Sequence, residues 1–150
     1  MNARSFILGL ILLGTASAAV AAQPPCLPTV EQAWIRAAPP GATAFAGYAT
    51  VRNGCGKVMS ITDVAARDFA MGMIHETRVL DGVSRMRHVR QLAVLPGGVL
   101  RFEPGGTHLM LMHPRRAIRA GDKLAVRLKL DDGREVAVLF EVRSQAPGTR

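Results

Sequence analysis

Apolar and polar residues alternate along the chain, or apolar residues run on without a break, in short segments separated by turn residues. A helical spacing of apolar positions is not sustained anywhere after the first 22 residues. Nine segments fit β-strands: 30–36, 44–52, 58–64, 71–80, 84–89, 98–102, 108–112, 123–130 and 135–142. Many short strands punctuated by Pro, Gly, Asn and Asp are typical of an all-β domain, either a β-sandwich or a Greek-key barrel.

One turn allows a register to be predicted. Asp81-Gly82 is the kind of residue pair that favours a tight type I′ hairpin. If Leu80 pairs with Val83, then His75 and Met86 lie on the same face of the hairpin as diagonal neighbours. Diagonal neighbours are roughly 7–8 Å apart, which is close enough for long side chains to share an ion.

The first 22 residues follow the order of a secretory signal peptide: a positive start, an apolar run and a small-residue stretch. Arg4 supplies the charge, residues 6–13 are apolar or glycine, and small residues dominate 15–22. Cleavage is expected after Ala21 or Ala22. A transmembrane anchor is the alternative, but the apolar run is far shorter than the roughly 20 residues that span a bilayer. We therefore expect export to the periplasm.

The chain is expected to have three parts: a signal peptide over residues 1–22, one β domain over 23–143 and a flexible polar tail over 144–150. No later segment is long and apolar enough to span a bilayer, so no stable membrane insertion is expected. The formal net charge of +8 is scattered over candidate strands and loops. Scattered charge argues against nucleic acid as a partner and favours a solvated basic surface, which can assist docking to an acidic protein.

Cys26 and Cys55 are the only cysteines. Two cysteines in an exported chain usually pair, because the periplasm is oxidising. Metal ligation is the alternative, although neither cysteine has a histidine within a few residues.

All four histidines and five of the seven methionines lie between residues 71 and 113. His108, Met110 and Met112 are spaced by two, so on a strand they share one face, while Leu109 and Leu111 share the other. The leucine face is expected to join the core. The histidine and methionine face needs a different explanation.

Thioether sulfur and imidazole nitrogen together suit Cu(I), whereas Mg, Ca and Mn prefer oxygen ligands. Imidazole must be neutral to bind a metal, so binding should weaken in acid. Methionine is also a common core filler. For Met71, Met73 and Met112 we favour a place in the core or at its lip, and we favour His88 and His113 as surface residues.

Four residues of this stretch form a longer pattern: His75, ten residues, Met86, twenty-one residues, His108, one residue and Met110. The pattern resembles the H-x10-M-x21-H-x-M signature of the periplasmic copper chaperone family PCuAC. The sequence around this pattern also resembles that family, over residues 33–142.

The resemblance implies a cupredoxin-like Greek-key β-barrel or sandwich with one Cu(I) per chain, held near the surface by His75, Met86, His108 and Met110. It implies a carrier rather than an enzyme, and we expect a monomer. The expected partners are copper acceptors, namely the copper-centre subunit of cytochrome c oxidase and Sco-type thiol proteins. Some relatives carry a further copper-binding tail rich in His and Met, but residues 144–150 contain neither.

Two other functions stay open on the sequence: a periplasmic copper store that protects against excess metal, and a non-metal β-sandwich interaction module. A blue-copper electron carrier is disfavoured, because that centre requires a Cys thiolate and Cys55 is the nearest cysteine to the cluster. A hydrolase is disfavoured because the sequence has no G-x-S-x-G or H-E-x-x-H motif.

Overall fold

The computed structural model describes residues 26–145, and within them the chain is built from β-strands alone. No helix among these residues is long and apolar enough to cross a membrane. The signal peptide expected over residues 1–22 and the end of the tail, from residue 146, lie outside the described residues.

Ten strands follow one another along the described chain. They are β1 (Thr29–Arg36), β2 (Ala44–Arg52), β3 (Met59–Ala66), β4 (Phe69–Leu80), β5 (Val83–His88), β6 (Leu92–Val94), β7 (Val99–Phe102), β8 (Thr107–Pro114), β9 (Lys123–Leu130) and β10 (Glu135–Arg143). All nine predicted segments are strands, and the short β6 is the addition. The prediction of an all-β fold is confirmed.

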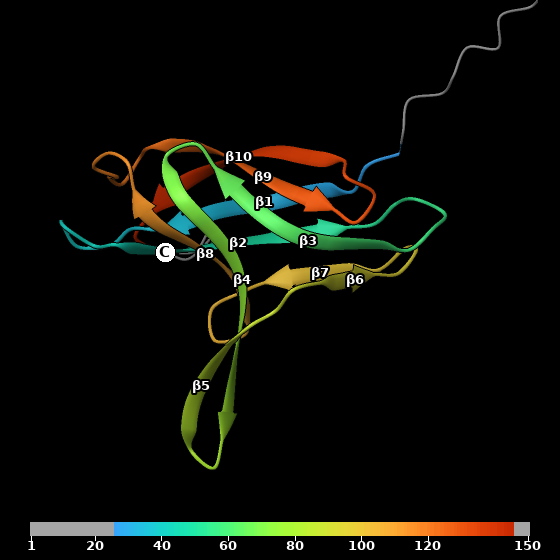
Figure 1. Cartoon of the computed structure of the whole chain (residues 1–150), viewed down its shortest axis with the longest axis horizontal. Coiled ribbons are helices and arrows are strands. Elements are labelled where there is room, and N and C mark those ends of the chain that lie inside the picture. Colours follow the sequence, from blue (N-terminus) through green and yellow to red (C-terminus); the bar gives the residue numbers. More distant parts are fainter. Residues whose placement is uncertain (1–25, 146–150) are drawn as a thin grey trace, which may run out of the picture.

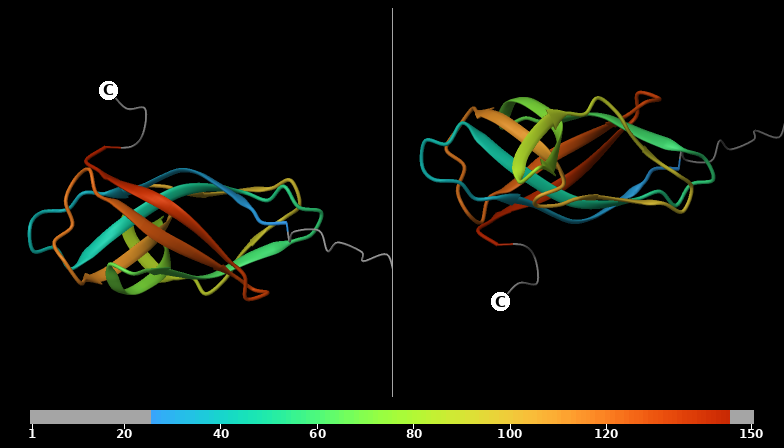
Figure 2. Two further views of the ribbon diagram at one scale, coloured as in Figure 1. Left: turned by 90° about the horizontal axis from the view of Figure 1, so that it is seen from above. Right: turned by 90° about the horizontal axis from the view of Figure 1, so that it is seen from below.

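The strands form one sheet in the order β5-β4-β8-β2-β1-β10-β9-β3-β6, with β7 also paired to β2. The pairing of β1 with β10 is parallel and the others are antiparallel. The sheet folds over so that β3 packs against β4, and the strands enclose one interior (Figure 2). That interior holds the buried apolar core, which includes Ile35, Val126 and Phe140.

The hairpin of β4 and β5 protrudes from the body of the molecule (Figure 1). Asp81 and Gly82 have φ angles of 52° and 75°, as both central positions of a type I′ turn require. Leu80 pairs with Val83 across this turn, so the predicted register is confirmed.

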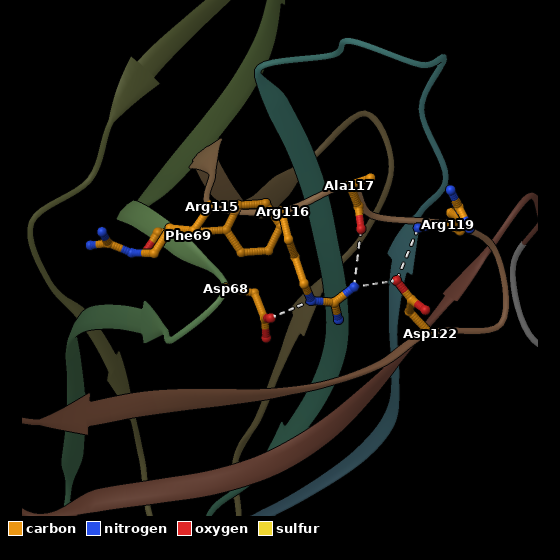
Figure 3. A network of polar contacts seen from close by, with 7 residues as sticks. All are labelled: Asp68, Phe69, Arg115, Arg116, Ala117, Arg119 and Asp122. Atoms are coloured by element: carbon orange, nitrogen blue, oxygen red, sulfur yellow. Dashed lines mark hydrogen bonds and ion pairs between the residues drawn. The ribbon is translucent and has the colours of Figure 1, made fainter.

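A polar network holds the loop after β8 against the turn between β3 and β4 (Figure 3). Arg116 donates from Nε to Asp68 Oδ1 at 2.7 Å and from Nη1 to Asp122 Oδ2 at 2.9 Å. The backbone N–H of Arg119, followed by the Arg116 guanidinium, holds the pKa of the Asp122 carboxyl below its usual value. These bonds tie together the chain segments that enter β4 and leave β8.

Cys26 and Cys55 form a disulfide. This pairing was expected, because the chain has two cysteines and export to the oxidising periplasm was predicted. The bond joins the segment before β1 to the loop after β2.

Replacing both cysteines with serine is expected to lower the free energy of unfolding by about 3 kcal/mol, because the cross-link restricts the unfolded chain. The bridge spans 29 residues. Urea unfolding of the mature protein without reductant measures the change, and reduced wild type should match the variant. Equal unfolding midpoints for oxidised wild type and variant would contradict the expectation.

Gly72 is the position where β4 meets β3 most closely. An ideal Cβ at Gly72 would lie 2.1 Å from the backbone oxygen of Val64, whereas a Cβ at Gly54 would meet nothing within 4 Å. Gly72→Ala should therefore destabilise the protein by about 3 kcal/mol, through overpacking against backbone. Gly54→Ala is the matched control and should stay within about 0.5 kcal/mol of wild type. If chemical denaturation gave the two variants similar stability, the close approach of β3 to β4 would be refuted.

Candidate metal centre

The antiparallel pairing of β4 and β8 sets histidine opposite histidine, with His75 paired to His108. Ile74 is 1% exposed and Leu109 is fully buried, so these neighbours point into the core. Because side chains alternate along a strand, His75, His108 and Met110 lie on the outer face. The predicted division of β8 into a leucine face and a histidine–methionine face is confirmed.

Met86 reaches this face from β5. It pairs with Thr77 across the hairpin, and its Sδ lies 3.2 Å from His75 Nδ1. A nitrogen and a sulfur bound to one tetrahedral ion, at bond lengths of about 2.0 and 2.3 Å, lie about 3.5 Å apart. His75 and Met86 therefore stand near the separation that a shared ion requires. Met86 is 56% exposed, so an ion here would be close to solvent.

The ring of His108 is buried and oriented by the turn before β8. Its Nδ1 lies 3.1 Å from the backbone oxygen of Gly106, and because a carbonyl only accepts, Nδ1 carries the proton and donates it. The same oxygen accepts the backbone N–H of Thr77 in β4 at 3.1 Å. This arrangement leaves Nε2 of His108 as the nitrogen available to a metal, as second-shell hydrogen bonds commonly do.

The spacing of the two imidazoles is compatible with one ion between them. The ring centroids of His75 and His108 are 6.1 Å apart. Two imidazoles on one ion would have centroids about 5 Å apart at a tetrahedral angle and about 6 Å apart when collinear, at nitrogen–metal bonds of about 2.0 Å. Met110 lies two residues from His108, about 7 Å along the strand, and its flexible side chain must cover that distance.

The electrostatics of the face favour neutral donors. Partial burial, followed by the neighbouring rings of His108 and His88, lowers the pKa of His75. A lowered pKa keeps the imidazole unprotonated, which is the form that binds a metal.

The carboxylate of Glu76, the residue after His75, is paired with two arginines. Glu76 accepts from Arg78 at 3.0 Å and from Arg87 Nε at 2.7 Å. The hydrogen bonds from Arg78 and Arg87 hold the pKa of this carboxyl below its usual value. The Arg87 contact joins β5 to β4 beside the histidines, while the Arg78 contact lies within β4, and sequence patterning had indicated neither.

The other histidines lie differently. His88 is exposed on β5 opposite His75, with ring centroids 6.0 Å apart. His113 is exposed near the far end of β8, where it has a φ of 54° and its backbone N–H donates to Thr43. Within residues 26–145, no three His, Cys, Asp or Glu side chains are gathered closely enough to hold a metal. A metal site on this face with three or more side-chain ligands would therefore need methionine sulfur.

Met71, Met73 and Met112 lie outside the core. The half-burial of Met73 and Met112 fits the expected place at its lip, whereas the exposure of Met71 does not. Met71 is 46% exposed, and the other two are half-buried. Met59 alone among the methionines of the described residues is buried in the interior, at 2% exposure.

Comparisons with known proteins agree with this architecture. The family described as "LpqE-like: Putative lipoprotein LpqE-like" matches residues 28–142. A protein of Leifsonia xyli subsp. xyli described as "Putative lipoprotein Lxx21020" is 33% identical over 116 residues, which cover 76% of this chain and 68% of that protein.

Two solved structures have a similar fold. The solution structure of CuI-DR1885 from Deinococcus radiodurans is 26% identical, with a TM-score of 0.65, covering 84% of each chain. The copper-bound PCuAC domain from PmoF2 is 21% identical with a TM-score of 0.64, covering 77% of this chain and 92% of that one.

The lowered pKa of His75 leads to a prediction for the metal-free protein. As pH falls below about 6.5, the usual histidine pKa, the unfolded chain takes up this proton before the folded protein does. The contribution of His75 should therefore reduce the stability of the fold as pH falls through that window toward the lower folded pKa.

NMR titration of the His75 ring protons should give a midpoint below 6.5, and urea unfolding at pH 7.5 and 5.5 should show a smaller loss of stability in His75→Gln than in wild type. A ring midpoint at or above the usual value of about 6.5 would contradict this expectation.

Proposed function

This chain belongs to the LpqE-like family and has the fold of PCuAC domains, and on this basis we propose that it binds Cu(I) through His75, Met86, His108 and Met110 and carries it as a periplasmic chaperone. The observation that supports this most directly is the approach of Met86 Sδ to within 3.2 Å of His75 Nδ1, on the face where His75 is paired with His108.

The donor chemistry supports a monovalent soft ion. Two imidazoles and two thioethers carry no charge, and soft sulfur donors select Cu(I) over hard cations. A divalent ion would gain little from this set, because it would receive no thiolate or carboxylate to balance its charge.

The exposure of the donors suits transfer of copper to a partner protein. His108 is 5% exposed and Met86 is 56% exposed, so one side of the ion would be held in the protein and the other would face solvent. An incoming thiolate can approach from the Met86 side and displace the thioether by ligand exchange, because thiolate binds Cu(I) more strongly than thioether does. No catalytic step is assigned to the site.

We propose that the acceptors are thiol-bearing copper proteins of the periplasm, the Sco-type proteins and the copper-centre subunit of cytochrome c oxidase. The net charge of +8 would favour encounter with acidic surfaces on such partners. Storage of excess copper is the competing role for the same site.

The test of the site is copper content and ligand identity. X-ray absorption of the reduced, Cu(I)-loaded mature protein should find two sulfur and two nitrogen donors at the high-affinity site. Met86→Ala and His108→Ala should each weaken Cu(I) binding at least tenfold in a competition assay, since even outer-shell changes cost about 10–100-fold. His113→Ala, which removes an exposed histidine away from the site, is the matched control and should bind as wild type does.

If both ligand variants kept their copper, the assignment of Met86 and His108 as ligands would be wrong. Absence of stoichiometric copper in wild type would favour the non-metal interaction module. Mixing the loaded protein with an excess of a CxxC-bearing acceptor separates delivery from storage. Copper should move to the acceptor within minutes if the protein is a chaperone, and retention of the ion would favour the store.

A further inference from the structure

Beyond the His75–His108 pair, the outer face of β4 and β8 carries two further cross-strand pairs, both of methionine. Met73 pairs with Met110, and Met71 pairs with Met112. Met110 belongs to the centre proposed above, which leaves Met71, Met73 and Met112 without an assigned role.

These three side chains share one surface. Leu111 is fully buried between Met110 and Met112 in sequence, and Gly72, between Met71 and Met73, faces the backbone of Val64 in the interior. By strand alternation the methionines on either side of these residues point outward.

The neighbouring strand leaves the methionines room. On β2, Ala44 pairs with Met112 and Ala46 with Met110. Their methyl side chains are short, and Met71 is 46% exposed while Met73 and Met112 are half-buried, so this face stays open to solvent. Burial in the core therefore does not explain why methionine occupies these positions.

The register allows three sulfur atoms to meet. Met71 and Met112 are directly opposite, and side chains in such pairs have Cβ atoms about 4.5–5.5 Å apart. Met73 is the diagonal neighbour of Met112, at about 7–8 Å. Methionine has three rotatable side-chain bonds, so all three thioethers can turn toward a point between the strands.

We propose that Met71, Met73 and Met112 form a second, weaker binding site for Cu(I), and for Ag(I) as a cation of the same soft, monovalent class. Three neutral thioethers offer a soft ion its preferred donors while offering hard cations none. This site shares no ligand with the histidine centre, so either can exist without the other. Because Met73 lies opposite Met110, this ion would lie within about 7 Å of Met110, the distance that two strand residues span, and so would be placed to move into the centre when the centre is empty.

The test uses the mature protein carrying methionines labelled with ¹³C at the ε-methyl group, titrated with Ag(I) and followed by NMR. The first equivalent should shift Met86 and Met110, and the second should shift Met71, Met73 and Met112. Met59, buried in the core, is an internal control whose signal should not move.

A matched set of variants locates the second ion. The triple variant Met71→Leu, Met73→Leu, Met112→Leu keeps side-chain volume and should reduce Ag(I) binding from two ions to one, with the Met86 shift preserved. Met59→Leu removes a methionine elsewhere and should still bind two. The double variant His75→Ala, Met86→Ala should retain one ion, reported by Met71 and Met112.

The second site would be overturned if Met71, Met73 and Met112 stayed unshifted through three equivalents, if they shifted together with Met86 at the first equivalent, or if the triple leucine variant still bound two ions. If Met86 and Met110 failed to shift, the proposed function would be refuted instead. The second site would then be judged from the signals of Met71, Met73 and Met112 alone.

Discussion

The pairing of β4 with β8 is the constraint on which the outer face depends. Ile74, Leu109 and Leu111 are buried on the inner side of the two strands. A slip of one residue in either strand would expose these apolar side chains and turn the histidines inward. Burial of the core thus fixes the register, and the register in turn sets His75 opposite His108. His75, His108 and Met110 need no contacts of their own to come together, because the inner face has already aligned them.

The donors differ in how firmly the fold holds them. His108 is buried, and its ring is bonded to the turn that also receives the Thr77 backbone N–H. Met86 is carried by β5, an edge strand in which every residue is exposed and which protrudes with the end of β4 (Figure 1). Segments with few buried contacts open at low free-energy cost. An ion bound by His108 and Met86 would have one ligand fixed on the body of the protein and one on the protruding hairpin. It could be bound with defined geometry and released by movement of the hairpin alone.

Local sequence patterns predicted the strands and the β4–β5 register, because both depend on nearest-neighbour physics: alternation, and an Asp-Gly turn with positive φ. They could not predict that β8 lies between β4 and β2, since strand order is set by long-range packing. The same limit explains why Met71 was wrongly expected in the core or at its lip. Spacing by two placed Met110 and Met112 on one face, but only the pairing with β4 shows that Met71 and Met73 join them outside the core.

Some features left no periodic signal at all. The three residues of β6 are too few to display alternation, and Gly72 looks like an ordinary strand residue until β3 is placed against it. The network of Arg116 with Asp68 and Asp122 joins chain positions that no local motif connects.

The selectivity proposed for the outer face would depend as much on the groups that are kept away as on those that are present. Glu76 is adjacent to His75 in sequence, yet strand alternation directs it to the other side of β4, and Arg78 and Arg87 engage its oxygens. A free carboxylate at that position would offer a hard donor and a negative charge, both of which favour divalent ions. With the carboxylate neutralised by guanidinium groups, the face presents neutral nitrogen and sulfur. The ion pairs of Glu76 with Arg78 and Arg87 would therefore also favour the soft, singly charged cation proposed for this face.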